Sequence, residues 1–216
     1  MDIMTITFPG KERRPCLAGC SQQQAQGRPT QLIIILTEYE LVENPSQIFF
    51  VRSLEPFFCP RCHSDQRIVI GSRNRILIRT TGIKIKLRIR RLRCKSCKTI
   101  HHELPSEVIP YKRHEAESIE AVLEERELLD TPADELTLKR WRAWFAGLAG
   151  HLLGALMSAA RRSNVKINMA PFAGCALRRI RRAVGDAPGW LSRIVQTAVK
   201  NNCWVQTRSA FHAGKP

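Results

Sequence analysis

Acidic residues are scarce in this chain of 216 residues, which has 19 Asp and Glu against 35 Lys and Arg. Aromatic residues are also few, at 6% of the sequence, whereas apolar residues make up 44%. This composition excludes a collagen, a mucin-like chain and a disordered acidic tail. The length allows one or two domains and excludes a large multidomain enzyme. Residues 1–8 lack the basic start and the apolar run of a signal peptide, so we expect a cytoplasmic protein.

The surplus of 16 positive charges is distributed in blocks. Residues 1–58 carry a net charge of −1, residues 59–114 carry +12, residues 115–136 carry −8 and residues 137–216 carry +13. Nucleic acids and anionic membrane surfaces both attract basic blocks of this kind. A basic block can also be a solvated surface with no partner. Charge alone therefore does not identify a partner, and the motifs inside the blocks are needed to choose between these alternatives.

Eight cysteines in a reducing cytoplasm are more often metal ligands or buried apolar residues than disulfide partners. Four of them form two C-x2-C pairs, Cys59-Pro-Arg-Cys62 and Cys94-Lys-Ser-Cys97. The two-residue gap lets both thiolates of a pair bind the same ion, so we expect one tetrahedral, structural Zn2+ site. Four sulfur ligands leave no coordination position for a catalytic water, which argues against an enzyme.

The 31 residues between the two pairs must bring the end of the segment back to its start. Apolar and cationic residues alternate over 83–90, which predicts a strand, and residues 80–82 and 76–78 predict the turn and the strand before it. The cationic positions are Lys84, Lys86, Arg88 and Arg90. Cations at this spacing, about 6.8 Å, could follow a phosphate backbone or could protect an exposed sheet edge.

Three other interpretations fit these motifs less well than the zinc site. The sequence from Cys59 to His63 has the C-x-x-C-H form of a haem attachment site, but haem would leave the second pair unexplained. A thioredoxin-like redox motif needs a βαβ context, which is absent from the pattern. His101 and His102 could replace a sulfur ligand, although a role as surface or phosphate-contact residues is more ordinary.

The residues after Pro110 have helical periodicity. We predict a scaffold helix over 115–129 with its acidic residues away from the apolar side, and a short second helix capped by Thr131. A third helix capped by Thr137 would bury the stripe Leu138, Trp141, Phe145 and Leu148 and leave Lys139, Arg140 and Arg142 outside it. This arrangement predicts a helix-turn-helix, although an ordinary core helix would show the same pattern.

Two further segments each allow more than one interpretation. Residues 143–160 contain only two polar side chains and include the Gly150-x-x-x-Gly154 pattern, so they suit a buried bundle helix better than a membrane helix. Residues 175–184 and 190–200 predict two helices separated by a Pro-Gly break. The first of these contains Arg178, Arg179, Arg181 and Arg182, which are candidates for phosphate or anionic-lipid contacts.

The run from Arg90 to Pro105, continued by 109–113, resembles an uncharacterised bacterial family known only as a domain of unknown function. That family is in turn similar to the zinc-ribbon and helix-turn-helix front end of insertion-sequence transposases. The resemblance spans about residues 57–144, with 204–211 as a closing segment. It implies zinc at the four paired cysteines and DNA binding by the helices. It does not imply a nuclease, because residues 137–216 contain one acid, Asp186, whereas a two-metal site needs clustered carboxylates.

Together these features predict an α+β protein in three parts: a flexible segment over 1–30, a β-rich zinc-ribbon domain over 31–113 and a helical domain over 114–216. We expect a non-enzymatic, zinc-stabilised DNA-binding protein that is transposase-related or regulatory. The rival function is an adaptor that docks on a transposase or polymerase, and a membrane-associated protein is a weaker third. The remaining cysteines are expected to be apolar fillers, Cys175 and Cys203, or part of the flexible opening, Cys16 and Cys20.

Overall fold

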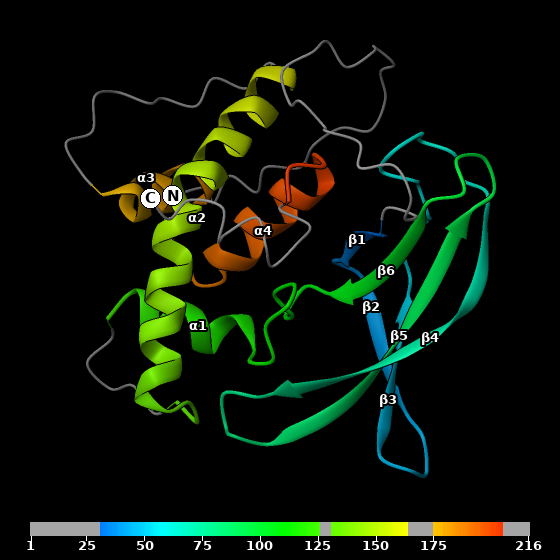
Figure 1. The fold of residues 1–216 in the computed structure, drawn as a ribbon, viewed down its shortest axis with the longest axis horizontal. Coiled ribbons are helices and arrows are strands. Elements are labelled where there is room, and N and C mark those ends of the chain that lie inside the picture. The colour runs from blue at the N-terminus through cyan, green and yellow to red at the C-terminus, as the bar shows by residue number, and fades with distance from the viewer. Residues whose placement is uncertain (1–30, 126–130, 164–174, 205–216) are drawn as a thin grey trace, which may run out of the picture.

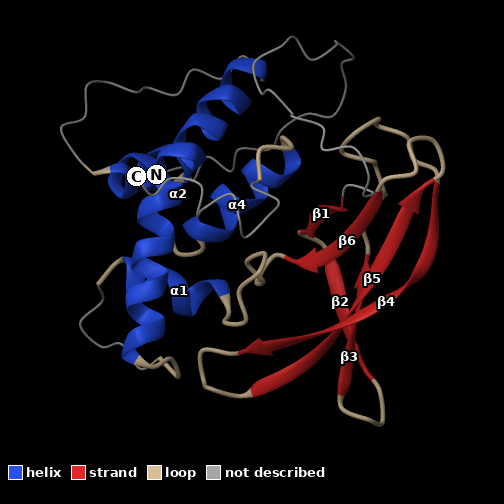
Figure 2. Ribbon diagram, viewed as in Figure 1, coloured by secondary structure: helices blue, strands red, loops and turns tan. Residues whose placement is uncertain are grey.

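The computed structural model describes residues 31–125, 131–163 and 175–204. In these residues the chain is mixed α+β, with a curled six-stranded sheet on one side and four helices on the other (Figures 1 and 2). All six strands precede all four helices in the sequence of the described residues. The predicted flexible segment, with Cys16 and Cys20, lies outside the described residues.

The sheet has the strand order β1-β6-β5-β3-β2, with β4 paired to the other edge of β5. Its strands are β1 (Gln31–Leu36), β2 (Tyr39–Glu43), β3 (Ile48–Ser53), β4 (Arg67–Ile78), β5 (Lys84–Cys94) and β6 (Ile100–Pro105). Strands β1 and β6 pair in parallel, as do β3 and β5, and the other pairs are antiparallel. The sheet is therefore larger than the isolated hairpin that the cysteine spacing predicts.

The β4–β5 hairpin is the longest feature of the sheet and curves across it (Figure 1). Its turn is closed by backbone hydrogen bonds between Arg79 and Ile83, and Gly82 has a φ of +83°, which favours glycine. Strand β5 has two unlike sides, because side chains alternate along a strand. We call the side with Lys84, Lys86, Arg88 and Arg90 the lysine face, and the side with Ile85, Leu87, Ile89 and Arg91 the core face.

Strand β6 is buried along its whole length although its sequence is Ile-His-His-Glu-Leu-Pro. It lies between β1 and β5, so both of its edges are paired. The buried Glu103 carboxylate is compensated by Arg90, whose Nε and Nη2 donate to it at 2.6 and 3.1 Å. A bidentate pair of this kind satisfies a carboxylate that would otherwise be costly to bury.

The four helices pack against each other and against the core side of the sheet. They are α1 (Ala116–Leu123), α2 (Glu135–Arg162), α3 (Ala176–Val184) and α4 (Trp190–Lys200). One core cluster contains side chains from both parts, including Leu87, Ile89 and Leu104 from strands and Phe145, Leu148 and Trp190 from helices. The strand and helix regions therefore share a hydrophobic core.

The tip of the hairpin is fastened to the start of α1. Arg79 Nη1 lies 2.9 Å from a Glu107 carboxylate oxygen and 2.7 Å from one of Glu115. The second Glu115 oxygen accepts from the Thr80 amide at 3.0 Å. Glu115 is only 8% exposed, so these charge-assisted contacts are shielded from solvent on its side and attach the hairpin tip to the start of α1.

The prediction of a short second helix after Thr131 is wrong, because α2 begins at Glu135 and runs for 28 residues. Asp134, not Thr137, caps it: the Asp134 carboxylate accepts from the Thr137 amide at 2.6 Å. The predicted buried stripe is confirmed for Trp141, Phe145 and Leu148. A helix-turn-helix is not formed by the described residues between α1 and α2.

The apolar part of α2 is long enough and hydrophobic enough to cross a membrane, with a mean hydropathy of 1.4 over the best window, and half of that window is buried within the fold. The core helix of a soluble protein meets the same criterion. Gly150 and Gly154 are exposed, and a Cβ added to either would meet no atom within 4 Å. These two glycines therefore make no close helix contact within the described residues.

Candidate metal centre

Two turns of the same construction carry the paired cysteines. In the first, the Cys59 amide donates to Ser64 O at 2.9 Å and the His63 amide donates to Cys59 O at 2.8 Å. In the second, the Cys94 amide donates to Thr99 O at 3.0 Å and the Lys98 amide donates to Cys94 O at 3.1 Å. His63 and Lys98 occupy matching positions with φ values of +59° and +60°. Each pair therefore folds its own turn, which brings both of its sulfurs to the same side.

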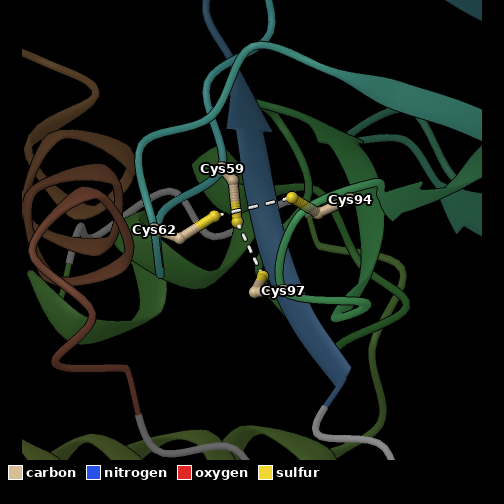
Figure 3. Close-up of side chains that lie close together, drawn as sticks. All are labelled: Cys59, Cys62, Cys94 and Cys97. Carbon is tan, nitrogen blue, oxygen red and sulfur yellow. Dashed lines mark hydrogen bonds between the residues drawn. The ribbon is translucent and has the colours of Figure 1, made fainter.

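The two turns face one another, so that the four sulfurs point into a common centre (Figure 3). All four sulfurs lie within 4.8 Å of one another. The Cys59–Cys97 and Cys62–Cys94 sulfur pairs are each separated by 3.5 Å. Sulfurs bound tetrahedrally to one ion at about 2.3 Å would lie about 3.8 Å apart. The cluster thus has the dimensions of a four-sulfur metal site.

The antiparallel pairing of β4 with β5 brings the two turns together. Arg67, at the start of β4, pairs with Cys94 at the end of β5, so the 31 residues between the cysteine pairs form a closed loop. The Lys95 amide also donates to Gln66 O at 3.0 Å, which joins the turns directly. A small second core of Phe57, Cys59, Leu92 and Cys94 lies beneath the sulfurs.

Burial and neighbouring polar groups change the pKa values of the cysteine thiols. Burial raises the pKa of the Cys59 thiol to about 12. Burial acts in the same direction on Cys97, but hydrogen bonds from the hydroxyl and amide of Thr99 help to lower its pKa to about 6. Thr99 is itself held by Arg61, whose Nη1 donates to the Thr99 hydroxyl at 3.3 Å. Cys97 is therefore the more readily ionised of these two thiols.

His101, a possible replacement ligand by sequence, lies against Cys59 in a cluster that already has four cysteines. Its Nε2 lies 3.3 Å from Cys59 Sγ, its side chain is fully buried, and its ring stacks edge-on against Phe57. Burial, followed by the charge of His102, lowers the pKa of His101 to about 4. A neutral imidazole with Nε2 protonated would donate to the Cys59 thiolate. The expectation that His101 and His102 are surface residues is wrong, since both are buried.

The cationic positions of the lysine face have different surroundings. Lys84 and Lys86 are exposed, and neither forms an ion pair in the described part of the chain. The Arg88 guanidinium lies 5.4 Å from the centre of the Phe50 ring. Arg90 is held by Glu103, as described above, so its charge is already neutralised within the sheet.

The helical candidates lie on exposed surfaces or in ion pairs. Lys139, Arg140 and Arg142 are exposed in the first turns of α2, with Lys139 paired to Glu135 at 2.8 Å. In α3, Arg181 lies 2.5 Å from Asp186 and 3.6 Å from Glu124. The other α3 candidates, Arg178, Arg179 and Arg182, are exposed or half-buried on the same helix.

Comparison with known proteins agrees with part of the expected resemblance. No curated protein and no solved structure matches the chain. The family Domain of unknown function (DUF6431) matches residues 59–141, and the match carries no link to transposases. The matched segment begins at the first cysteine of the cluster, contains β4, β5, β6 and α1, and ends in the first turns of α2. Residues 59–141 are therefore similar to the DUF6431 family, and the complete four-sulfur cluster lies inside the matched segment.

Proposed function

We propose that this protein is a DNA-binding protein in which a structural Zn2+ ion fixes the base of a cationic hairpin. The observation that carries the proposal is the four-sulfur cluster at the end of the hairpin that presents Lys84 and Lys86 to solvent. Four thiolates in a closed tetrahedral arrangement suit zinc, and they leave no position for a reacting water. The metal would therefore hold the fold and would not perform chemistry.

The lysine face supplies the contact surface in this proposal. Lys84 and Lys86 are two residues apart on one strand, at about the spacing of successive phosphates. Arg88, lying against the exposed Phe50 ring, adds a third cation and an aromatic surface. Lys139, Arg140 and Arg142 on α2 would add phosphate contacts. The choice of DNA over RNA rests on the resemblance to transposase front ends, which also suggests a transposon-related or regulatory role.

DNA binding should weaken steeply with salt, because each neutralised phosphate releases condensed counterions. For a duplex, the slope of log affinity against log salt is about −0.9 per phosphate contact. We expect Lys84→Gln with Lys86→Gln to reduce the magnitude of this slope by about 2, and fluorescence anisotropy over about 50–200 mM salt would measure it.

The matched control is Lys95→Gln with Lys200→Gln, which removes two exposed lysines away from the lysine face. The control should keep the wild-type slope to within about 0.5. Equal losses in both variants would show that net charge, and not the lysine face, governs binding.

His101 should tune the affinity of the site for zinc without being a ligand. Replacing a group that donates to a metal-bound thiolate typically costs about 10-fold to 100-fold in metal affinity. We therefore expect His101→Phe to bind one zinc ion per chain with an affinity lower by this factor, measured by competition with a chromophoric chelator. Loss of the zinc stoichiometry itself would instead make His101 a ligand.

A second candidate function is protein docking beside the metal centre. Phe58 is 60% exposed and directly precedes Cys59, and Leu54 is 59% exposed nearby in the sequence. Exposed apolar side chains of this size mark interaction surfaces when they gather into a patch. An adaptor that uses this surface would bind DNA weakly or not at all, so the salt titration separates the two functions.

A further inference from the structure

The core face of the hairpin changes from apolar to cationic toward the cysteine end. On β4, Arg73 and Arg75 lie on the same side of the strand as Leu77. On β5, Arg91 lies on the same side as Ile89. His102 of β6 pairs directly with Arg91 across the sheet. Diagonal neighbours on one side of a sheet are within reach of long side chains, so the four residues share one surface. We call Arg73, Arg75, Arg91 and His102 the arginine cluster.

Three nitrogens of the arginine cluster are buried without a hydrogen-bond partner in the described part of the chain: Arg75 Nε, Arg91 Nε and His102 Nε2. They come from three adjacent strands, β4, β5 and β6. His102 is only 8% exposed. Buried polar atoms normally have partners, so three unpaired nitrogens on one surface indicate a ligand that supplies acceptors.

No carboxylate of the described residues forms an ion pair with the arginine cluster. Burial lowers the pKa of His102, and Arg91, Arg73 and Arg75 lower it further, while no carboxylate acts in the opposite direction. Arg75 is held in place by backbone carbonyls, since its Nη2 donates to Lys112 O at 2.7 Å and to Ile109 O at 3.4 Å. Like charges therefore lie near one another, and the part of the fold that the structure describes supplies no carboxylate to neutralise them.

Space for a ligand exists beside Arg91. Its register partner on β4 is Gly71, which has no side chain and lies next to an irregularity in the strand. Gly71 has a φ of +140°, and a Cβ added there would meet no atom within 4 Å. The neighbouring Arg73 is exposed, so solvent reaches this end of the cluster.

We propose that the arginine cluster is a binding site for a phosphate group, with Arg73, Arg91 and His102 as contacts and Arg75 behind them. Planar guanidinium groups recognise phosphate through paired N–H donors, and the Arg73 and Arg91 guanidiniums with the His102 imidazole match a doubly charged anion better than a single carboxylate. This site lies on the opposite side of the hairpin from the lysine face. It is independent of the proposed function, because it requires a phosphate group but not a DNA duplex.

Thermal unfolding with inorganic phosphate as the probe tests the site. At about 20 mM phosphate, compared with chloride at equal ionic strength, we expect a higher Tm for the wild type because the anion binds the folded state. Arg73→Gln removes an exposed contact and should abolish most of this shift, as should Arg73→Gln with Arg91→Gln. Lys84→Gln with Lys86→Gln removes the same number of charges from the other face and should keep it.

The binding of single-stranded oligonucleotides, prepared either with or without a 5′-phosphate, distinguishes the possible sources of the phosphate group. If the protein prefers the phosphorylated strand and Arg73→Gln removes this preference, the ligand is a terminal phosphate. If both strands bind equally and Arg73→Gln weakens the binding of both, the ligand is a phosphate of the nucleic-acid backbone. A phosphate-dependent Tm shift without oligonucleotide binding would assign a free phosphate compound. The proposal is overturned if phosphate does not raise the wild-type Tm, if Arg73→Gln keeps the full shift, or if the lysine-face variant loses it.

Discussion

Replacing Cys94 by serine should remove the bound metal and unfold the cysteine end of the hairpin. Cys94 is fully buried, and its sulfur lies 3.5 Å from that of Cys62. Zinc binding to small domains contributes about 10 kcal/mol or more of apparent free energy, which is coupled to folding. We expect metal content to fall from about one ion per chain to less than about 0.1, measured by mass spectrometry of the purified protein.

Hydrogen exchange locates the resulting damage. Amides in the two cysteine turns and at the end of β5 should exchange rapidly in Cys94→Ser, whereas α2 should stay protected by the main core. Cys175→Ser is the matched control, because Cys175 is an exposed free cysteine outside the cluster. If Cys94→Ser keeps a full complement of metal, or if Cys175→Ser loses it equally, the assignment of the ligands is wrong.

Replacing Glu120 by alanine should strongly destabilise the helical part. Glu120 lies in α1 and is 1% exposed. Its two carboxylate oxygens accept from the backbone amides of Gly189 and Leu191 at 2.8 and 2.9 Å. Gly189 is the N-cap of α4 and offers no side chain, so Glu120 supplies the cap from another helix.

Hydrogen bonds to a charged group contribute about 1.5–3 kcal/mol, and the buried Leu191 amide and the half-buried Gly189 amide would lose their partner. We therefore expect Glu120→Ala to lower the free energy of unfolding by about 3 kcal/mol, measured as a lower urea midpoint with an unchanged slope. Glu117→Ala changes an exposed carboxylate of the same helix and should cost less than about 1 kcal/mol. Equal effects of the two substitutions would show that the cap does not stabilise the fold.

Local sequence patterns predict the hairpin and the last two helices well. The alternation around Lys84 and Lys86 places β5 with the correct sides, and the Pro-Gly break separates α3 from α4 at the residues observed. The C-x2-C spacing predicts the sulfur cluster, because each turn is formed by consecutive residues. These features depend on neighbours in the chain, which a periodic pattern records.

The features that the sequence does not predict depend on distant partners. Glu103 and His101 would be poor residues for a buried strand if they were alone, but Arg90 and Cys59 supply the missing partners. The parallel pairing of β1 with β6 joins residues far apart in the chain and leaves no local signal. The start of α2 is misplaced for another reason: Asp134 and Thr137 are both good N-caps, and only the structure shows that Asp134 is used.

The acidic residues of α1 also depend on distant partners that the sequence pattern does not predict. Their helical positions predict a solvated side, yet Glu120 is buried and Glu124 accepts from the Trp190 indole at 2.7 Å. The partners of these two carboxylates lie in α4, about 70 residues later in the sequence. Periodicity identifies which residues share a helix face, but it does not show which face meets another helix.

X-ray absorption at the zinc edge of the purified protein tests the central claim most directly. The account predicts four sulfur neighbours at about 2.3 Å and no nitrogen or oxygen neighbour at about 2.0 Å. Absence of zinc, or a first shell with three sulfurs and one lighter atom, would contradict it.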